Sequence, residues 1–203
     1  MPDDGKADGL ATFNMNNVFP DDLLTNDTAM DASDVQAFLE DSPYGGRSWL
    51  ADATVGDGSF AEAVVAAAHA DHIHPLVLIA RMQVESSGVS KHPGATTLEH
   101  ALGCGCPDGG GCSASYSGLG NQLTCAAHVL RTLYDESEDG SGEWRKGHTK
   151  KTLDPKTVTP ATNATAALYG YTPWVLVGRG GTWLAWNVTR RFVAHADALG
   201  LLH

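Results

Sequence analysis

The chain has 203 residues, a length typical of a single domain. Its composition, 42% hydrophobic and 18% charged, is that of a globular protein able to bury a sizeable core. The formal net charge of -11 argues against nucleic acid or anionic lipid as partners, because no basic stripe is present to neutralise phosphates.

Polar residues rich in glycine and aspartate occupy the N-terminus. Residues 1–12 therefore predict a flexible tail, followed by one domain at 13–203. The opening MPDDGKADG has neither the basic nor the apolar region of a signal peptide, and the sequence contains no apolar run long enough to span a membrane. We expect a mature N-terminus from which a leader has been removed.

Apolar residues at helical spacing predict the first two helices. One covers about residues 30–39, with Asp31 or Ser33 as its N-cap. The next is FAEAVVAAAHADH, residues 60–72, capped by Ser59 and carrying an alanine-rich face suited to close helix packing.

A third helix begins at Pro75, because proline suits the first helical turn, and Gly88 is its expected stop. Its apolar stripe has the spacing i, i+3 and i+6, given by Leu76, Ile79 and Met82. Glu85 continues the same stripe, so it is expected to face inward or into a cleft. Packing alone does not require a charge at that position.

The second half of the chain alternates loops and helices. Residues 88–118 read as a loop, 121–134 as an amphipathic helix and 135–160 as a charged, irregular excursion. A short helix capped by Thr162 and stopped by Gly170 and Pro173 follows, and a last helix carrying two tryptophans ends near residue 198. Strand signals are nearly absent, which predicts an all-α fold.

Four cysteines are present, and three of them lie in CGCPDGGGC, residues 104–112. One interpretation is a pair of disulfides around a glycine-rich loop, which indicates an oxidising compartment. The other is a zinc site that includes nearby His100. We favour disulfides, because the spacing lacks two separated C-x-x-C pairs. The histidines of HADHIH, residues 69–74, form a weaker metal candidate, because His74 precedes Pro75 and leaves the helix face; we expect no metal.

Glu85 has a chemical interpretation and two structural ones. Burial in an apolar pocket raises the pKa of a glutamate and suits it to donate a proton. A solvated residue at a helix end, or an ion pair with Arg81, would equally account for a glutamate here.

Five segments of the chain carry a resemblance to a known family: MDASDVQAFL (30–39), IHPLVLIARMQVE (73–85), CPDGGGCSASYSGLGNQ (106–122), AALYGYTP (166–173) and LAWNVTRRF (184–192). In this order they resemble the secreted actinobacterial-type branch of the lysozyme-like superfamily, which contains bacterial lytic transglycosylases, goose-type lysozymes and related glucosaminidases. The resemblance implies a lysozyme-like helical fold with a disulfide-stapled loop. It also implies a Cys106–Cys112 disulfide, with Cys104–Cys125 as the remaining pair.

The resemblance further implies a set of site residues. Glu85, followed by a serine, matches the catalytic acid of the superfamily, and the expected substrate-binding residues are Ser86, Asn121, Gln122, Tyr169 and Tyr171. Alternative roles are a helix cap for Ser86 or Asn121 and core packing for either tyrosine. Asp108 is the candidate second carboxylate, ahead of Glu99, although an aspartate before glycines also forms turns. Substrate-assisted enzymes need only one carboxylate.

These features predict a secreted or cell-envelope enzyme that cleaves the β-1,4 glycan of peptidoglycan as a lytic transglycosylase or lysozyme-type hydrolase. We expect a monomer without a cofactor. One alternative is a carbohydrate-binding or structural protein on the same scaffold, which the repulsion between an acidic protein and an anionic wall favours. A glycosidase acting on chitin-type glycans is another.

Overall fold

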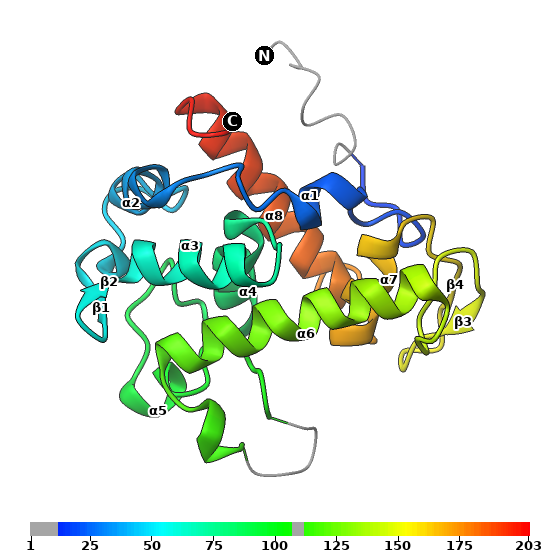
Figure 1. The fold of residues 1–203 in the computed structure, drawn as a ribbon. Helices are drawn as coiled ribbons and strands as arrows, with labels where there is room; N and C mark the ends of the chain where they lie inside the picture. The colour runs from blue at the N-terminus through cyan, green and yellow to red at the C-terminus, as the bar shows by residue number, and fades with distance from the viewer. Residues whose placement is uncertain (1–11, 107–111) are drawn as a thin grey trace.

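The computed structural model describes residues 12–106 and 112–203 and shows a mainly helical protein, which confirms the predicted all-α class (Figure 1). The helices are α1 (Asp21–Thr25), α2 (Ala32–Glu40), α3 (Phe60–Ala70), α4 (Pro75–Ser86), α5 (Ala95–Leu98), α6 (Leu119–Asp139), α7 (Asn163–Tyr171) and α8 (Gly181–Ala198), with 3-10 turns at Trp49–Asp52 and Ala114–Tyr116. Two antiparallel strand pairs join them: β1 (Thr54–Val55) with β2 (Gly58–Ser59), and β3 (Lys150–Lys151) with β4 (Thr157–Val158).

Helix α4 is the centre of the molecule. Every residue from Pro75 to Met82 is buried, and the helix packs against α8, α3 and α6 (Figure 1). A helix buried on all sides satisfies its backbone internally and contributes apolar surface to several neighbours at once. The predicted stripe of Leu76, Ile79 and Met82 is confirmed, with each side chain fully buried.

The N-terminal caps follow the local sequence. Asp31 and Ser59 each complete a capping box, the former with Asp34 and the latter with Glu62. Thr162 accepts a hydrogen bond from the Thr165 backbone at the start of α7, as predicted. These bonds satisfy backbone N–H groups that the first turn of a helix leaves without partners.

The predicted end of α4 was one residue late, and two other predicted helix ends were wrong. Ser87, in the left-handed conformation at φ 57°, ends α4 one residue before Gly88. Helix α6 continues to Asp139, where Gly140 takes the left-handed conformation at φ 81°. Gly170 is the second-last residue of α7 and not its stop, and a Cβ there would come within 2.7 Å of the Leu133 side chain on α6. That glycine permits close packing of the two helices.

The N-terminal part of the chain joins the domain within the described residues. The ring of Phe13 packs edge-on against Trp186 of α8, with 5.4 Å between centroids. Residues 1–11 of the predicted tail lie outside the described residues. Among the helices that the structure describes, no single one is long and apolar enough to cross a membrane; α3 and α4 pass that test only as a pair bent by 114°.

His74, the N-cap of α4, makes the stability of the fold depend on pH. Its ring Nδ1 accepts a hydrogen bond from the Leu76 backbone at 3.1 Å, and the side chain is almost fully buried. Burial lowers the pKa of His74 from 6.5 to about 4, with the charge of Asp22 partly opposing the shift. The folded protein therefore holds this ring neutral at pH values where the unfolded chain protonates it.

We predict a loss of stability as the pH falls from about 6.5 to 4, because the unfolded state then binds a proton that the folded state excludes. The shift corresponds to about 3 kcal/mol. Urea unfolding at pH 7 and pH 4 measures it. In His74→Asn, which keeps a capping acceptor without this titration, the pH dependence should shrink by about that amount. An unchanged pH dependence in the variant would contradict the assignment.

Candidate active site

Glu85 lies in the last turn of α4, three residues after the buried Met82. Its side chain is 32% exposed, whereas the residues that precede it in the stripe are fully buried. The helix thus carries one carboxylate from the core to the surface.

Arg81 contacts this carboxylate from one turn earlier in the helix. Its Nη2 donates a hydrogen bond to Oε1 of Glu85, although the Arg81 side chain itself is only 2% exposed. The ion pair considered from the sequence is therefore present. It also shows that the immediate surroundings of Glu85 include a guanidinium and are not the wholly apolar pocket expected. Among the described residues, Nε and Nη1 of Arg81 have no hydrogen-bond partner.

Tyr171, at the end of α7, packs its ring against Arg81. The guanidinium carbon is 4.3 Å from the centre of the tyrosine ring, a cation–π arrangement. The Tyr171 hydroxyl donates a hydrogen bond to the Leu102 carbonyl at 3.0 Å. Burial raises the pKa of this hydroxyl, and the charge of Arg81 partly opposes the effect. Tyr171 thus links the pair on α4 to the loop between α5 and α6, which carries three of the four cysteines and is called the cysteine loop below.

Gly103 brings the backbone of that loop against Glu85. A Cβ at this position would lie 3.2 Å from Oε2 of Glu85, and the residue has φ 71°. Both the left-handed backbone and the close approach favour glycine. Three segments therefore meet at the Arg81–Glu85 pair: the end of α4, the end of α7 and the loop at Leu102–Gly103.

Two disulfides hold the loop, as predicted. Cys104 bonds to Cys125 of α6, and Cys106 bonds to Cys112. The first joins the loop to a helix, and the second closes the short segment that contains residues 107–111. Those residues, and with them the candidate second carboxylate Asp108, lie outside the described residues.

Gln122 anchors the same loop from α6. Its side chain is fully buried; Oε1 accepts hydrogen bonds from the backbone N–H groups of Leu102 and Cys104, while Nε2 donates to the carbonyls of Cys104 and Tyr116. Two acceptances and two donations use the full capacity of a primary amide. Gln122 therefore holds the loop in place, and its amide has no donor or acceptor left to bind a sugar.

The remaining predicted residues divide between the site and elsewhere. Ser86 donates to the Met82 carbonyl at 2.7 Å and so binds its own helix. Asn121 is exposed, is the third residue of α6 and not its N-cap, and donates to the Ser117 carbonyl. Tyr169 is fully buried, stacks on Trp144 and donates to the Met15 carbonyl; burial raises its pKa to about 12. Of the two tyrosines, Tyr171 alone contacts the Arg81–Glu85 pair.

Two cavities lie near predicted site residues, and they share no lining residue. One, of about 330 Å³, lies between the end of α4 and α8. It is lined by Gln83, Val84 and Ser87, by residues of α8 and by Tyr44. Another of about 310 Å³ lies beside the β1–β2 turn and includes Asn121. Neither has Glu85 in its lining, so these two cavities do not unite Asn121 with the carboxylate.

Leu102 and Gly103 are the site residues that the sequence did not predict. Leu102 contributes only a backbone carbonyl, which no side-chain pattern announces. The signal for Gly103 is its place directly before the CGC motif, where a glycine can provide a left-handed turn.

Together, fold and site define a helical, disulfide-bonded domain with a partly exposed carboxylate at the end of its central helix. The family model described as "LasA, N-terminal domain" matches residues 17–173, and the chain belongs to this family. The match runs from before α1 to the end of α7 and includes Arg81, Glu85, Tyr171 and the four cysteines, whereas α8 lies beyond it. No curated protein and no solved structure matches the chain.

We predict that Gln122→Ala lowers the free energy of unfolding by about 3 kcal/mol or more, because it leaves several buried backbone groups without partners. Asn121→Ala, the adjacent exposed amide, should change it by less than about 0.5 kcal/mol. Urea unfolding of both variants gives the comparison. Equal effects would contradict the assigned difference between the two amides.

Proposed function

We propose that the protein is a secreted enzyme that cleaves the β-1,4 glycan backbone of peptidoglycan, with Glu85 as general acid and base. The observation that carries the proposal is the placement of this carboxylate: a buried helix leads to it, the Gly103 backbone lies against it, and its partner Arg81 packs on the ring of Tyr171. The ordered resemblance to the lysozyme-like superfamily supports the same assignment.

The two carboxylate oxygens of Glu85 have different surroundings. Oε1 accepts the hydrogen bond from Arg81, while Oε2 is the atom nearest the position that a Cβ of Gly103 would take. Under the proposal, Oε2 is the oxygen that exchanges a proton with the substrate. Cleavage requires a proton on the leaving oxygen, and in a transglycosylase the same carboxylate takes a proton from the sugar's own hydroxyl.

Arg81 would stabilise the ionised form of the carboxylate after proton transfer. When Glu85 carries a proton, the guanidinium still has the face of the Tyr171 ring as a partner. Tyr171 is thus a positioning residue in this mechanism, because it holds both Arg81 and the Leu102 carbonyl. Asp108 remains the proposed second carboxylate should the reaction be a hydrolysis.

The environment that suits the two disulfides is an oxidising compartment outside the cytoplasm, and this supports secretion or a cell-envelope location. We propose that the protein acts there as a monomer.

A second candidate function is a glycan-binding or structural module with no catalysis. The Arg81–Glu85 ion pair favours it, because it gives the carboxylate a structural reason to be present. The internal hydrogen bonds of Gln122 and Tyr169 favour it as well, because they remove two residues from the expected sugar contacts.

We predict that Glu85→Gln abolishes release of muropeptides from purified peptidoglycan, since the amide lacks a transferable acidic proton. Its side-chain oxygen still accepts from Arg81, so the fold should persist. Mass spectrometry of the products separates the mechanisms: anhydro ends indicate a transglycosylase and reducing ends a hydrolase. Asp108→Asn then tests the second carboxylate, which only the hydrolase needs.

The matched control is Glu138→Gln, which changes an exposed glutamate near the end of α6 and should retain full activity. Chitooligosaccharides in a parallel assay distinguish a chitin-type substrate. Wild-type protein that releases nothing from several wall types yet sediments with them would overturn catalysis in favour of the binding module.

A further inference from the structure

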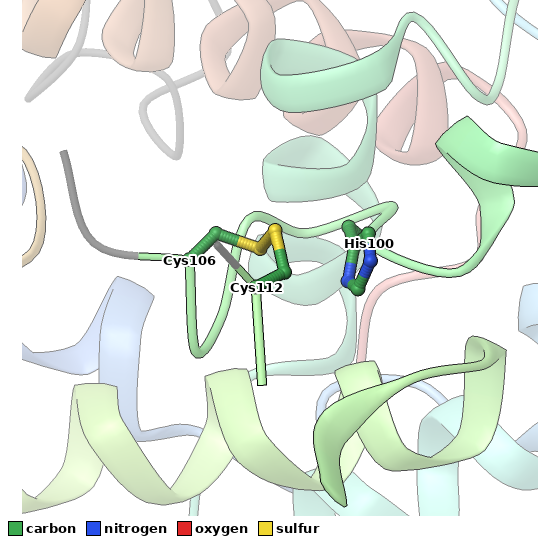
Figure 2. Close-up of side chains that lie close together, drawn as sticks. All are labelled: His100, Cys106 and Cys112. Atoms are coloured by element: carbon green, nitrogen blue, oxygen red, sulfur yellow. A yellow bond between two sulfur atoms is a disulfide. The ribbon is translucent and has the colours of Figure 1, made fainter. Parts of the chain in front are cut away.

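A histidine lies beside the outer disulfide of the loop. Figure 2 shows the imidazole of His100 next to the sulfur atoms of Cys106 and Cys112. The ring nitrogen and the two sulfurs lie within 4.8 Å of one another. The Nδ1 of His100 is buried and has no hydrogen-bond partner among the described residues. Buried polar atoms in folded proteins nearly always have a hydrogen-bond partner or a bound ion.

The two disulfides differ in their accessibility. Cys104 is 5% exposed and Cys125 is 9% exposed, so the inner bond is shielded by the core. Cys112 is exposed and Cys106 is half-buried. A reductant in solution therefore reaches the outer bond first, because thiol–disulfide exchange requires direct attack on a sulfur atom.

Opening the outer bond would leave its two cysteines close together. The Ser113 N–H, next to Cys112, donates to the Gly105 carbonyl, next to Cys106, at 2.9 Å. The backbone that carries His100 is also held to the loop, because the Gly103 N–H donates to the His100 carbonyl at 2.9 Å. The Cys104–Cys125 disulfide and the Gln122 amide hold the loop at Cys104, which we call the root of the loop. Neither depends on the Cys106–Cys112 bond.

Two thiolates and an imidazole are ligands that zinc prefers. Tetrahedral zinc holds such donor atoms roughly 3.5–3.8 Å apart, within the range that the three residues already span. Three protein ligands leave the fourth position to water, as in zinc sites with an open coordination position.

We propose that the Cys106–Cys112 disulfide is a redox-gated zinc site, in which reduction creates a Cys₂His centre with His100. A dithiol donates two electrons and two protons: the S–S bond breaks, two thiols form, and the dithiol becomes a disulfide. On binding Zn²⁺ the two thiols release two protons, and neutral His100 supplies a ring nitrogen. The inference does not depend on glycan cleavage, because none of the three ligands belongs to the Glu85 site.

The experiment uses the full chain under limited reduction by a phosphine, which gives two thiols and a phosphine oxide with one water consumed. Alkylation and peptide mass spectrometry verify that Cys106 and Cys112 are free while Cys104–Cys125 is intact. Zinc is then titrated against a chromophoric chelator, and Co²⁺ reports thiolate ligation by its charge-transfer absorption. We expect one zinc ion per reduced chain and none for the oxidised protein.

His100→Ala should weaken zinc binding by the reduced protein at least about tenfold, since loss of a ligand exceeds the effect of losing an outer-shell partner. His92→Ala, in the same segment, should bind as the wild type does. Circular dichroism confirms that each variant is folded, and Cys112→Ser provides a second ligand deletion. Equal affinity in His100→Ala, no zinc binding after verified reduction, or prior opening of Cys104–Cys125 would each overturn the proposal.

Discussion

A buried guanidinium constrains the centre of this protein. Arg81 is 2% exposed on a helix that is otherwise apolar from Pro75 to Met82, and a charge in such surroundings requires a partner. Removing the partner of a buried ion costs about 3–5 kcal/mol in typical proteins. Glu85, one turn further along, meets that requirement from the surface end of the helix, and the face of Tyr171 meets it from α7.

The cysteine loop depends on a second constraint, the need to satisfy backbone groups in a segment without regular structure. Gln122 binds four backbone groups of this segment from within α6, and the Cys104–Cys125 bond fixes the same stretch covalently. Since a buried backbone group without a hydrogen bond is costly, the amide and the disulfide together define one conformation at the root of the loop. That conformation places Gly103 against Glu85.

The sequence predicts most of the fold where local chemistry decides the structure. The caps at Asp31, Ser59 and Thr162 and the start of α4 at Pro75 follow from residues within one helical turn. Gly170 shows the limit, because it reads locally as a stop but exists to admit Leu133 from another helix. The choice between local and tertiary roles for a glycine depends on a neighbour far away in sequence.

The candidate site shows the same division. The spacing of Arg81 and Glu85 makes their contact predictable, because residues four apart share a helix face. Whether an amide or a tyrosine faces a ligand or the core is decided by distant backbone atoms, as Gln122 and Tyr169 illustrate. Among the described residues, Arg81 bonds Oε1 of Glu85 and leaves Oε2 to the proton transfer proposed for it. The architecture at the loop root, held by Gln122 and Cys104–Cys125, does not rest on Glu85. The loop therefore keeps its shape without Glu85, and the structural role of this carboxylate is confined to its ion pair with Arg81 on α4.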